Sequence, residues 1–214
     1  MPGAREDKHR FELDGGTIAL DFVNTVSGVR GGESPSDRLA GYPDIVYWAE
    51  QVGLIDARQA AALYREAERH PQRAGAAFAE AIRRREALHD VVLSAIDGGA
   101  TPERGLETLN AWIAEALAHR KLRVAAPGRF EAALEEDGDL LAFLRPIALD
   151  AAELLEREVS SGLVGVCAER EAGGCAWLFL DTSRNHSRRF CSMSDCGNRA
   201  KQRRHYRRTK GLQV

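Results

Sequence analysis

The sequence predicts a mainly α-helical protein with small β elements. Apolar residues recur every three to four positions over most of residues 42–117 and again over residues 139–160. Short apolar runs beside Gly and Pro interrupt this rhythm, and all four cysteines lie in the last third of the chain. We therefore expect a helical domain in residues 1–160 and a separate cysteine-containing module in residues 161–214.

The composition is that of a globular protein. The chain has 214 residues, of which 44% are hydrophobic and 29% are charged. No apolar run approaches the about 20 residues that span a bilayer, and the first residues lack the apolar stretch of a signal peptide. We expect a cytoplasmic protein without a membrane partner.

Residues 11–26, FELDGGTIALDFVNTV, predict a small hairpin or a strand that enters a helix, because two apolar segments flank Gly15-Gly16. If the second segment is helical, Asp21 and Asn24 share a face and could line a polar ligand pocket. Alternatively, they cap a turn and bond to backbone groups. Residues 30–43 are rich in Gly, Ser and Pro, which predicts a surface loop.

Two helices are expected next. Pro43 suits the first turn of a helix that ends at Gly53. Asp56 and Gln59 form a capping-box pattern at the start of the second helix, which should stop near Pro71.

A longer helix is predicted over about residues 74–96, with the arginines at 83–85 facing outward. Thr101 is a candidate N-cap for the following helix, with Pro102 in its first turn. Trp48 and Trp112 are expected in the core.

The helical rhythm breaks at residues 121–136. KLRVAA and RFEAALEE, separated by Pro127-Gly128, predict two strands around a tight turn. Residues 139–160 return to helical spacing, but Pro146 should produce a kink or divide the segment into two shorter helices. A junction is expected at residues 160–162.

The cysteines form a cluster. They comprise two pairs separated by fifteen residues: Cys167, Cys175, Cys191 and Cys196. Because structural disulfides are rare in the cytoplasm, this clustering predicts a tetrahedral Zn²⁺ site with thiolate ligands.

The apolar run at residues 177–180 should pair with a strand at residues 163–166, which places the first cysteine pair on a hairpin. Cys196 would lie in the first turn of a C-terminal helix, with Ser194 as its N-cap.

The charge is distributed unevenly along the chain. Residues 184–210 contain ten Arg or Lys residues and one Asp, a net charge of +9, which leaves −11 for the remainder. An acidic body with a basic tail indicates a polyanionic partner.

A family resemblance supports this interpretation. Residues 175–210, CAWLFLDTSRNHSRRFCSMSDCGNRAKQRRHYRRTK, closely resemble the CGNR zinc finger, whose name matches residues 196–199. Residues 11–26 resemble the start of the ABATE domain, which precedes this finger in bacterial proteins described as stress-induced transcription regulators. The resemblance implies a treble-clef-like zinc finger of a β-hairpin and a helix, attached to a helical domain. It also implies nucleic-acid binding, with DNA favoured over RNA.

One feature departs from the family pattern. Seven residues separate Cys167 from Cys175, where the family implies a shorter knuckle. Either Cys167 or His186 is therefore the fourth zinc ligand.

The basic residues of the tail are the candidates for nucleic-acid binding. On a helical wheel most of them occupy one broad arc, and no apolar stripe is present, so the zinc link through Cys196 is expected to anchor the helix. The candidates are Arg188, Arg189, Arg199, Lys201, Arg203, Arg204, Arg207 and Arg208.

Other roles remain open for these cations. Arg188, Arg189 and Arg199 could neutralise a four-thiolate zinc centre, and the tail could dock on the acidic body of the same chain or of a second copy. In the alternative function the chain is a zinc-stabilised protein–protein interaction module.

Motifs of the common enzyme classes are absent. The sequence has no HExxH, GxSxG, P-loop or dinucleotide-binding pattern, so we expect no enzymatic activity. The helical domain is expected to sense a small-molecule or protein effector, or to form a homodimer.

Overall fold

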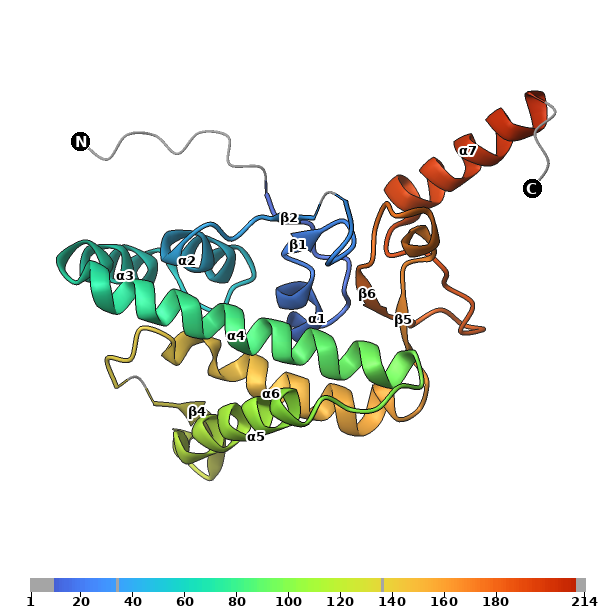
Figure 1. Cartoon of the computed structure of the whole chain (residues 1–214). Coiled ribbons are helices and arrows are strands. Elements are labelled where there is room, and N and C mark those ends of the chain that lie inside the picture. The colour runs from blue at the N-terminus through green and yellow to red at the C-terminus, as the bar shows by residue number, and fades with distance from the viewer. Residues whose placement is uncertain (1–9, 34, 136, 211–214) are drawn as a thin grey trace.

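The computed structural model describes residues 10–33, 35–135 and 137–210, and it confirms the predicted fold class. Residues 1–9 and 211–214, which belong to the two predicted regions, lie outside the described residues. Figure 1 shows a body of packed helices, along which the long helix α4 runs, and a smaller C-terminal module from which helix α7 projects. The helices of the body are α1 (Ile18–Val23), α2 (Tyr42–Gln51), α3 (Ala57–Arg69), α4 (Pro71–Ile96), α5 (Glu103–Ala118) and α6 (Arg145–Glu153).

The core forms around the short helix α1. Phe22 is fully buried, and its ring centroid lies 5.2 Å from that of Trp48 and 6.4 Å from that of Trp112. Burial of such a side chain contributes about 2–3 kcal/mol. Helix α1 packs against α4 and α6 of the body and also against strand β6 (Leu178–Leu180) of the C-terminal module. The β5–β6 region therefore contributes Val164 and Leu178 to the core of the body, whereas the cysteines lie in a second buried cluster.

Local signals set most helix boundaries. The Asp56 carboxylate accepts a bond from the Gln59 amide and the Gln59 side chain bonds back, which confirms the predicted capping box of α3. Pro43 lies in the first turn of α2, as expected, and Pro71, near which α3 was expected to stop, is the first residue of α4. The prediction that Thr101 caps α5 is wrong. The extended residue before this helix is Pro102, which has no side-chain donor or acceptor, and it makes no capping bond.

The arginines at 83–85 do not all face outward. Arg85 is 2% exposed, and its guanidinium donates to the Asp37 carboxylate at 2.9 and 2.6 Å and to Thr25 Oγ1 at 2.9 Å. A buried charge is tolerated when it is paired and hydrogen-bonded. Through these hydrogen bonds to Thr25 and Asp37, Arg85 links both ends of the segment between them to helix α4.

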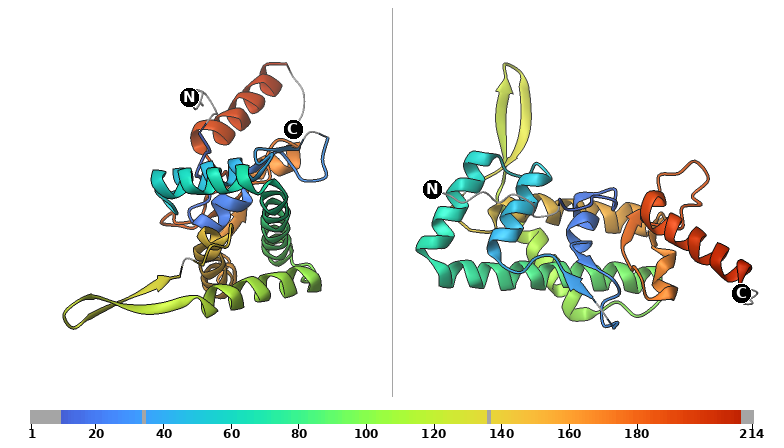
Figure 2. Two further views of the ribbon diagram at one scale, coloured as in Figure 1. Left: turned by 90° about the vertical axis from the view of Figure 1, so that its left-hand side faces the viewer. Right: turned by 90° about the horizontal axis from the view of Figure 1, so that it is seen from above.

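Three antiparallel two-stranded sheets complete the described fold. Strand β1 (Val26–Ser27) pairs with β2 (Ser36–Asp37), which lies within the expected surface loop of residues 30–43. Strands β3 (Arg120–Ala126) and β4 (Arg129–Leu134) form the predicted hairpin, which Gly128 closes with φ of +74°. Strand β5 (Val164–Val166) pairs with β6. Figure 2 shows that the β3–β4 hairpin projects from the body.

The segment between the hairpin and the C-terminal module consists of several short helical pieces. A 3₁₀ turn at Ala142–Leu144 leads into α6, and a π-helical turn at Leu154–Val159 follows it. Pro146 lies in the first turn of α6, where its missing N–H has no cost, so the prediction of shorter helices is correct.

The N-terminal segment connects the two regions. The expected hairpin or strand at residues 11–16 is absent: the Gln51 side chain bonds to both the N–H and the carbonyl of Phe11, and the Gly15 carbonyl accepts from the Leu180 N–H at 2.8 Å. The Asn24 side-chain amide accepts from the Leu178 N–H at 2.9 Å and donates to the Leu178 carbonyl at 2.8 Å. Trp177 Nε1 donates to the Val26 carbonyl at 2.7 Å. Asn24 therefore pairs with β6 as a neighbouring strand would.

Asp21 is also engaged with the backbone. Asp21 is only 9% exposed, and its Oδ1 accepts a hydrogen bond from the Gly15 N–H at 2.8 Å. The structure thus places Asp21 and Asn24 on backbone groups, as in the turn-cap alternative. Burial raises the pKa of Asp21 from 3.8 to about 6; the Gly15 bond opposes this shift, and Asp14 and Asp150 add to it.

Asp21→Asn is expected to stabilise the protein near neutral pH. Because the pKa is higher in the folded state, Asp21 favours folding while it is protonated, and this contribution is lost as the pH rises through about 6. Asparagine keeps the acceptor but cannot ionise. Between pH 4 and pH 7, the free energy of unfolding of the variant should rise by about 2–3 kcal/mol relative to that of the wild type. Urea unfolding at several pH values measures this difference. A difference that does not change with pH would contradict this assignment.

Candidate metal centre and basic helix

Four cysteine side chains converge in the C-terminal module. Two come from the β5–β6 hairpin and two from the segment that leads into helix α7 (Asn198–Thr209). All are buried, none forms a disulfide, and their sulfur atoms lie within 4.8 Å of one another: Cys167, Cys175, Cys191 and Cys196.

The sulfur spacing fits a tetrahedral zinc ion. Cys175 Sγ lies 3.7 Å from Cys191 Sγ, which lies 3.5 Å from Cys196 Sγ. A Zn–S distance of about 2.3 Å gives a tetrahedron with an edge of about 3.8 Å. A disulfide would require about 2.05 Å. The donor set is therefore that of a closed, structural zinc site.

The first cysteine pair is placed by backbone pairing. The Cys167 N–H donates to the Trp177 carbonyl at 2.9 Å, which extends the β5–β6 hairpin. The seven residues between Cys167 and Cys175 form a 3₁₀ turn at Ala168–Ala172, which ends at Gly173 with φ of +71°. The long spacing is thus accommodated in a compact turn.

The second pair lies at a π-helical turn, with Cys191 before the turn and Cys196 inside it. Ser192 is extended, the turn covers Met193–Gly197 and holds Cys196, and α7 continues from it. The prediction that Ser194 is the N-cap is wrong, because Ser194 lies inside the π-helical turn and its hydroxyl lies 2.9 Å from that of Ser192.

His186 lies outside the sulfur cluster. Among the described residues, the group with metal-ligand geometry contains Cys167 and no histidine. His186 is exposed, and its Nδ1 lies 3.2 Å from the Asp181 carbonyl oxygen.

Two of the predicted nucleic-acid-binding arginines hold the module together. The Arg188 guanidinium donates to the carbonyls of Leu180 and Asp14 at 3.1 and 2.9 Å, and also to those of Phe190 and Cys191. Arg199 Nη2 lies 3.0 Å from Cys196 Sγ and 2.9 Å from Asp195 Oδ2. The thiol and then the carboxylate raise the pKa of Arg199. The Arg199 contact matches the alternative in which this arginine neutralises the sulfur cluster, whereas Arg188 bonds to backbone carbonyls.

Helix α7 has a second anchor that the sequence did not reveal. Arg203 donates to the Glu169 carboxylate with both Nη atoms, at 2.8 and 2.5 Å. The Glu169 side chain is 3% exposed and the Arg203 side chain is 42% exposed. Glu169 belongs to the turn between the first two cysteines, so that turn fixes the direction of α7.

The two partners of this ion pair should differ in their effect on stability. Arg203→Met leaves a buried carboxylate without a partner and should lower the free energy of unfolding by about 2–3 kcal/mol. Glu169→Gln keeps a hydrogen-bond acceptor and leaves Arg203 exposed to water, so it should lower the free energy of unfolding by about 1 kcal/mol. Urea unfolding of the zinc-loaded protein measures both. Equal losses would show that Glu169 is not effectively buried.

The remaining cations line an open groove beside α7. Its volume is about 860 Å³, and Glu169 and Phe190 lie in its wall. All residues of α7 from Lys201 onward are exposed, as is Arg189. Apart from the paired Arg203, the exposed cations that line the groove are Arg189, Lys201, Arg204, Arg207 and Arg208.

The fold and the four-sulfur site define a zinc-finger protein with a helical body. The ABATE family model matches residues 16–158 and the CGNR zinc finger model matches residues 164–209. The chain therefore belongs to the ABATE family, whose description is "Putative stress-induced transcription regulator", and it carries a CGNR zinc finger. The finger family and the four buried cysteines identify Zn²⁺ as its cofactor.

No curated protein matches the chain. Neither family description names an enzymatic reaction. In the described part of the chain, no helix has the length and apolarity needed to cross a membrane.

Proposed function

We propose that the protein is a regulator that binds nucleic acid through a zinc-organised helix, with DNA as the favoured partner. The observation that carries this proposal is the groove beside α7, where four exposed cations of the helix gather with Arg189, and a buried cluster holds the base of the helix. The family description of a transcription regulator favours DNA over RNA.

The four cysteines would hold the zinc ion. Their spacing and burial leave no ligand position for water, so the metal would serve structure and not catalysis. The cluster around them is small: among the described residues it contains the four cysteines with Trp177 and Phe179, and Phe190 packs against it. Metal binding would therefore supply most of the stability of the finger.

Burial does not hold α7 in place. None of its residues is buried, and it extends from the module into solvent (Figure 1). Its connection to the rest of the finger runs through the sulfur cluster and through the Arg203–Glu169 ion pair. Twelve residues make a rod about 18 Å long, and the major groove of DNA, about 12 Å wide, admits a helix.

The contacts divide the predicted nucleic-acid-binding residues into two sets. Arg188, Arg199 and Arg203 bond to groups of the finger, and Arg188 also bonds to the Asp14 carbonyl. These three arginines would therefore act by fixing the shape and position of the finger. The exposed groove cations would contact phosphates, and each phosphate neutralised adds about −0.9 to the log–log salt slope on duplex DNA.

Fluorescence anisotropy tests the proposal directly. Labelled random duplex DNA, single-stranded DNA and RNA are titrated with the full chain over a salt series, with and without a zinc chelator. We expect tightest binding to duplex DNA, a steep salt slope, and a large loss of affinity when zinc is removed. Equally weak binding to all three polymers would refute it and favour a protein–protein interaction module.

A further inference from the structure

The β3–β4 hairpin forms an arm that exposes apolar side chains to solvent. We define the arm as residues 120–134, which project from the body in both views of Figure 2. Leu122 is 76% exposed, and Val124 and Phe130 are each 68% exposed. An isolated two-stranded hairpin is only marginally stable in water, so we expect another surface to pack against the apolar side chains of this arm.

The arm has one apolar and one polar face. Residues opposite each other in the register share a face, and Leu122 pairs with Ala132 while Val124 pairs with Phe130. The other face carries Arg123 opposite Glu131. Such alternation is typical of a hairpin with one buried face.

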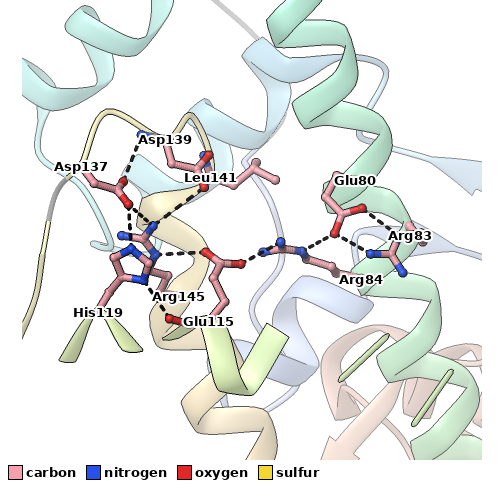
Figure 3. A network of polar contacts seen from close by, with 9 residues as sticks. All are labelled: Glu80, Arg83, Arg84, Glu115, His119, Asp137, Asp139, Leu141 and Arg145. Carbon is pink, nitrogen blue, oxygen red and sulfur yellow. Dashed lines mark hydrogen bonds and ion pairs between the residues drawn. The ribbon is translucent and has the colours of Figure 1, made fainter. Parts of the chain in front are cut away.

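An ionic network around the buried Arg145 fixes both ends of the arm (Figure 3). Arg145 is 1% exposed and donates to Asp137 at 2.7 Å and to the Glu135 carbonyl at 2.7 Å, just after β4. His119 Nε2, just before β3, lies 2.8 Å from Asp137 Oδ2. Glu115 links Arg145 to Arg84 of α4. The arm therefore leaves the body in a defined direction.

An apolar pocket continues the apolar face at the base of the arm. Its volume is about 270 Å³, and Leu134, the last residue of β4, lines it together with Leu54, Leu63 and Phe143. Leu134 pairs with Arg120 and lies on the same face as Leu122. Glu135 and Asp139 add carboxylates to the pocket wall.

We propose that this arm binds a second copy of the chain. Two arms would pack antiparallel, apolar face against apolar face, so that each tip reaches the pocket at the base of the other arm. The contact is isologous, since the same surface serves both copies. This dimer is independent of nucleic-acid binding by α7.

Charge supports a second copy as the occupant. The arm contains four basic residues and one acidic residue, a net charge of +3, whereas the chain without the arm and without residues 184–210 carries −14. Arg129 at the tip would meet the carboxylates of the partner's pocket. The polar face would remain in solvent.

The area is sufficient for a specific contact. Seven residues of strand give a face about 23 Å long, and two strands with their side chains make it about 10 Å wide. Two such faces and two filled pockets bury on the order of 1,000 Å² in total, which is the lower limit for a specific interface.

Sedimentation velocity of the full chain over a concentration series tests the proposal. We expect the wild type to sediment as a dimer of the 23.5 kDa chain. Val124→Ser/Phe130→Ser should weaken dimerisation at least thirtyfold. Ala62→Arg places a charge at an exposed helical position in the pocket wall. This variant should also weaken dimerisation at least thirtyfold, because it alters the pocket that receives the tip of the partner's arm.

The matched control is Arg123→Ser/Glu131→Ser, which changes the opposite face of the arm and keeps the net charge. It should leave the dimer intact, and circular dichroism checks that each variant folds. A monomeric wild type at high micromolar concentration, or a dimer unaffected by Val124→Ser/Phe130→Ser, would overturn the proposal. A monomer whose duplex DNA binding requires Phe130 would instead assign the arm to nucleic acid.

Discussion

Cys191→Ser/Cys196→Ser is expected to abolish zinc binding and to unfold the C-terminal module. The two remaining sulfurs cannot complete a tetrahedral site, and a serine hydroxyl is a poor replacement for a thiolate. Structural zinc contributes about 10–16 kcal/mol of apparent binding free energy. Two aromatic side chains and two cysteines would be left in the buried cluster, which is too little apolar surface to replace that contribution.

Zinc content by mass spectrometry should fall from one ion to less than a tenth of an ion per chain. Hydrogen exchange should show loss of protection in β5 and β6, whereas helices α2 to α5 stay protected. His186→Ala is the matched control and should keep one zinc ion. Retention of zinc by the double serine variant, or its loss in His186→Ala, would contradict the ligand assignment.

Charge reversal on the exposed part of α7 should have the second largest effect. Arg204→Glu/Arg208→Glu changes two groove-lining cations four residues apart on one helical face. We expect duplex DNA affinity to fall at least a hundredfold at 0.15 M salt. The log–log salt slope should decrease by about 1.8, because two phosphate contacts are lost.

Arg58→Glu/Arg65→Glu provides a control with the same change in net charge. Both positions are exposed on α3, at the end of the body away from α7 (Figure 1). Fluorescence anisotropy should show little change for this variant. Equal losses in the two variants would mean that net charge, and not the helix, determines binding.

Features that depend on neighbouring residues could be predicted from the sequence. The Asp56–Gln59 capping box, the turn at Pro127-Gly128 and the first turn at Pro43 each involve a few residues. The physical reason is that caps and turns satisfy backbone groups locally. Cysteine spacing likewise indicated the sulfur cluster.

Features that depend on distant partners could not be predicted. Arg85 is buried because Asp37, 48 residues away, meets it. Nothing near Glu169 in the sequence indicates that Arg203 pairs with it 34 residues later. The sequence pattern placed Arg203 among the cations predicted to bind nucleic acid. Its ion pair with Glu169 instead gives it the role of positioning helix α7. The arm was recognised as a hairpin, but its exposure followed only from the tertiary structure.

Zinc K-edge X-ray absorption on the native protein tests the central claim most directly. A single zinc ion held by the two cysteine pairs predicts four sulfur neighbours at about 2.3 Å and no nitrogen neighbour. A first shell that contains nitrogen or oxygen, or a protein purified without zinc, would contradict that claim.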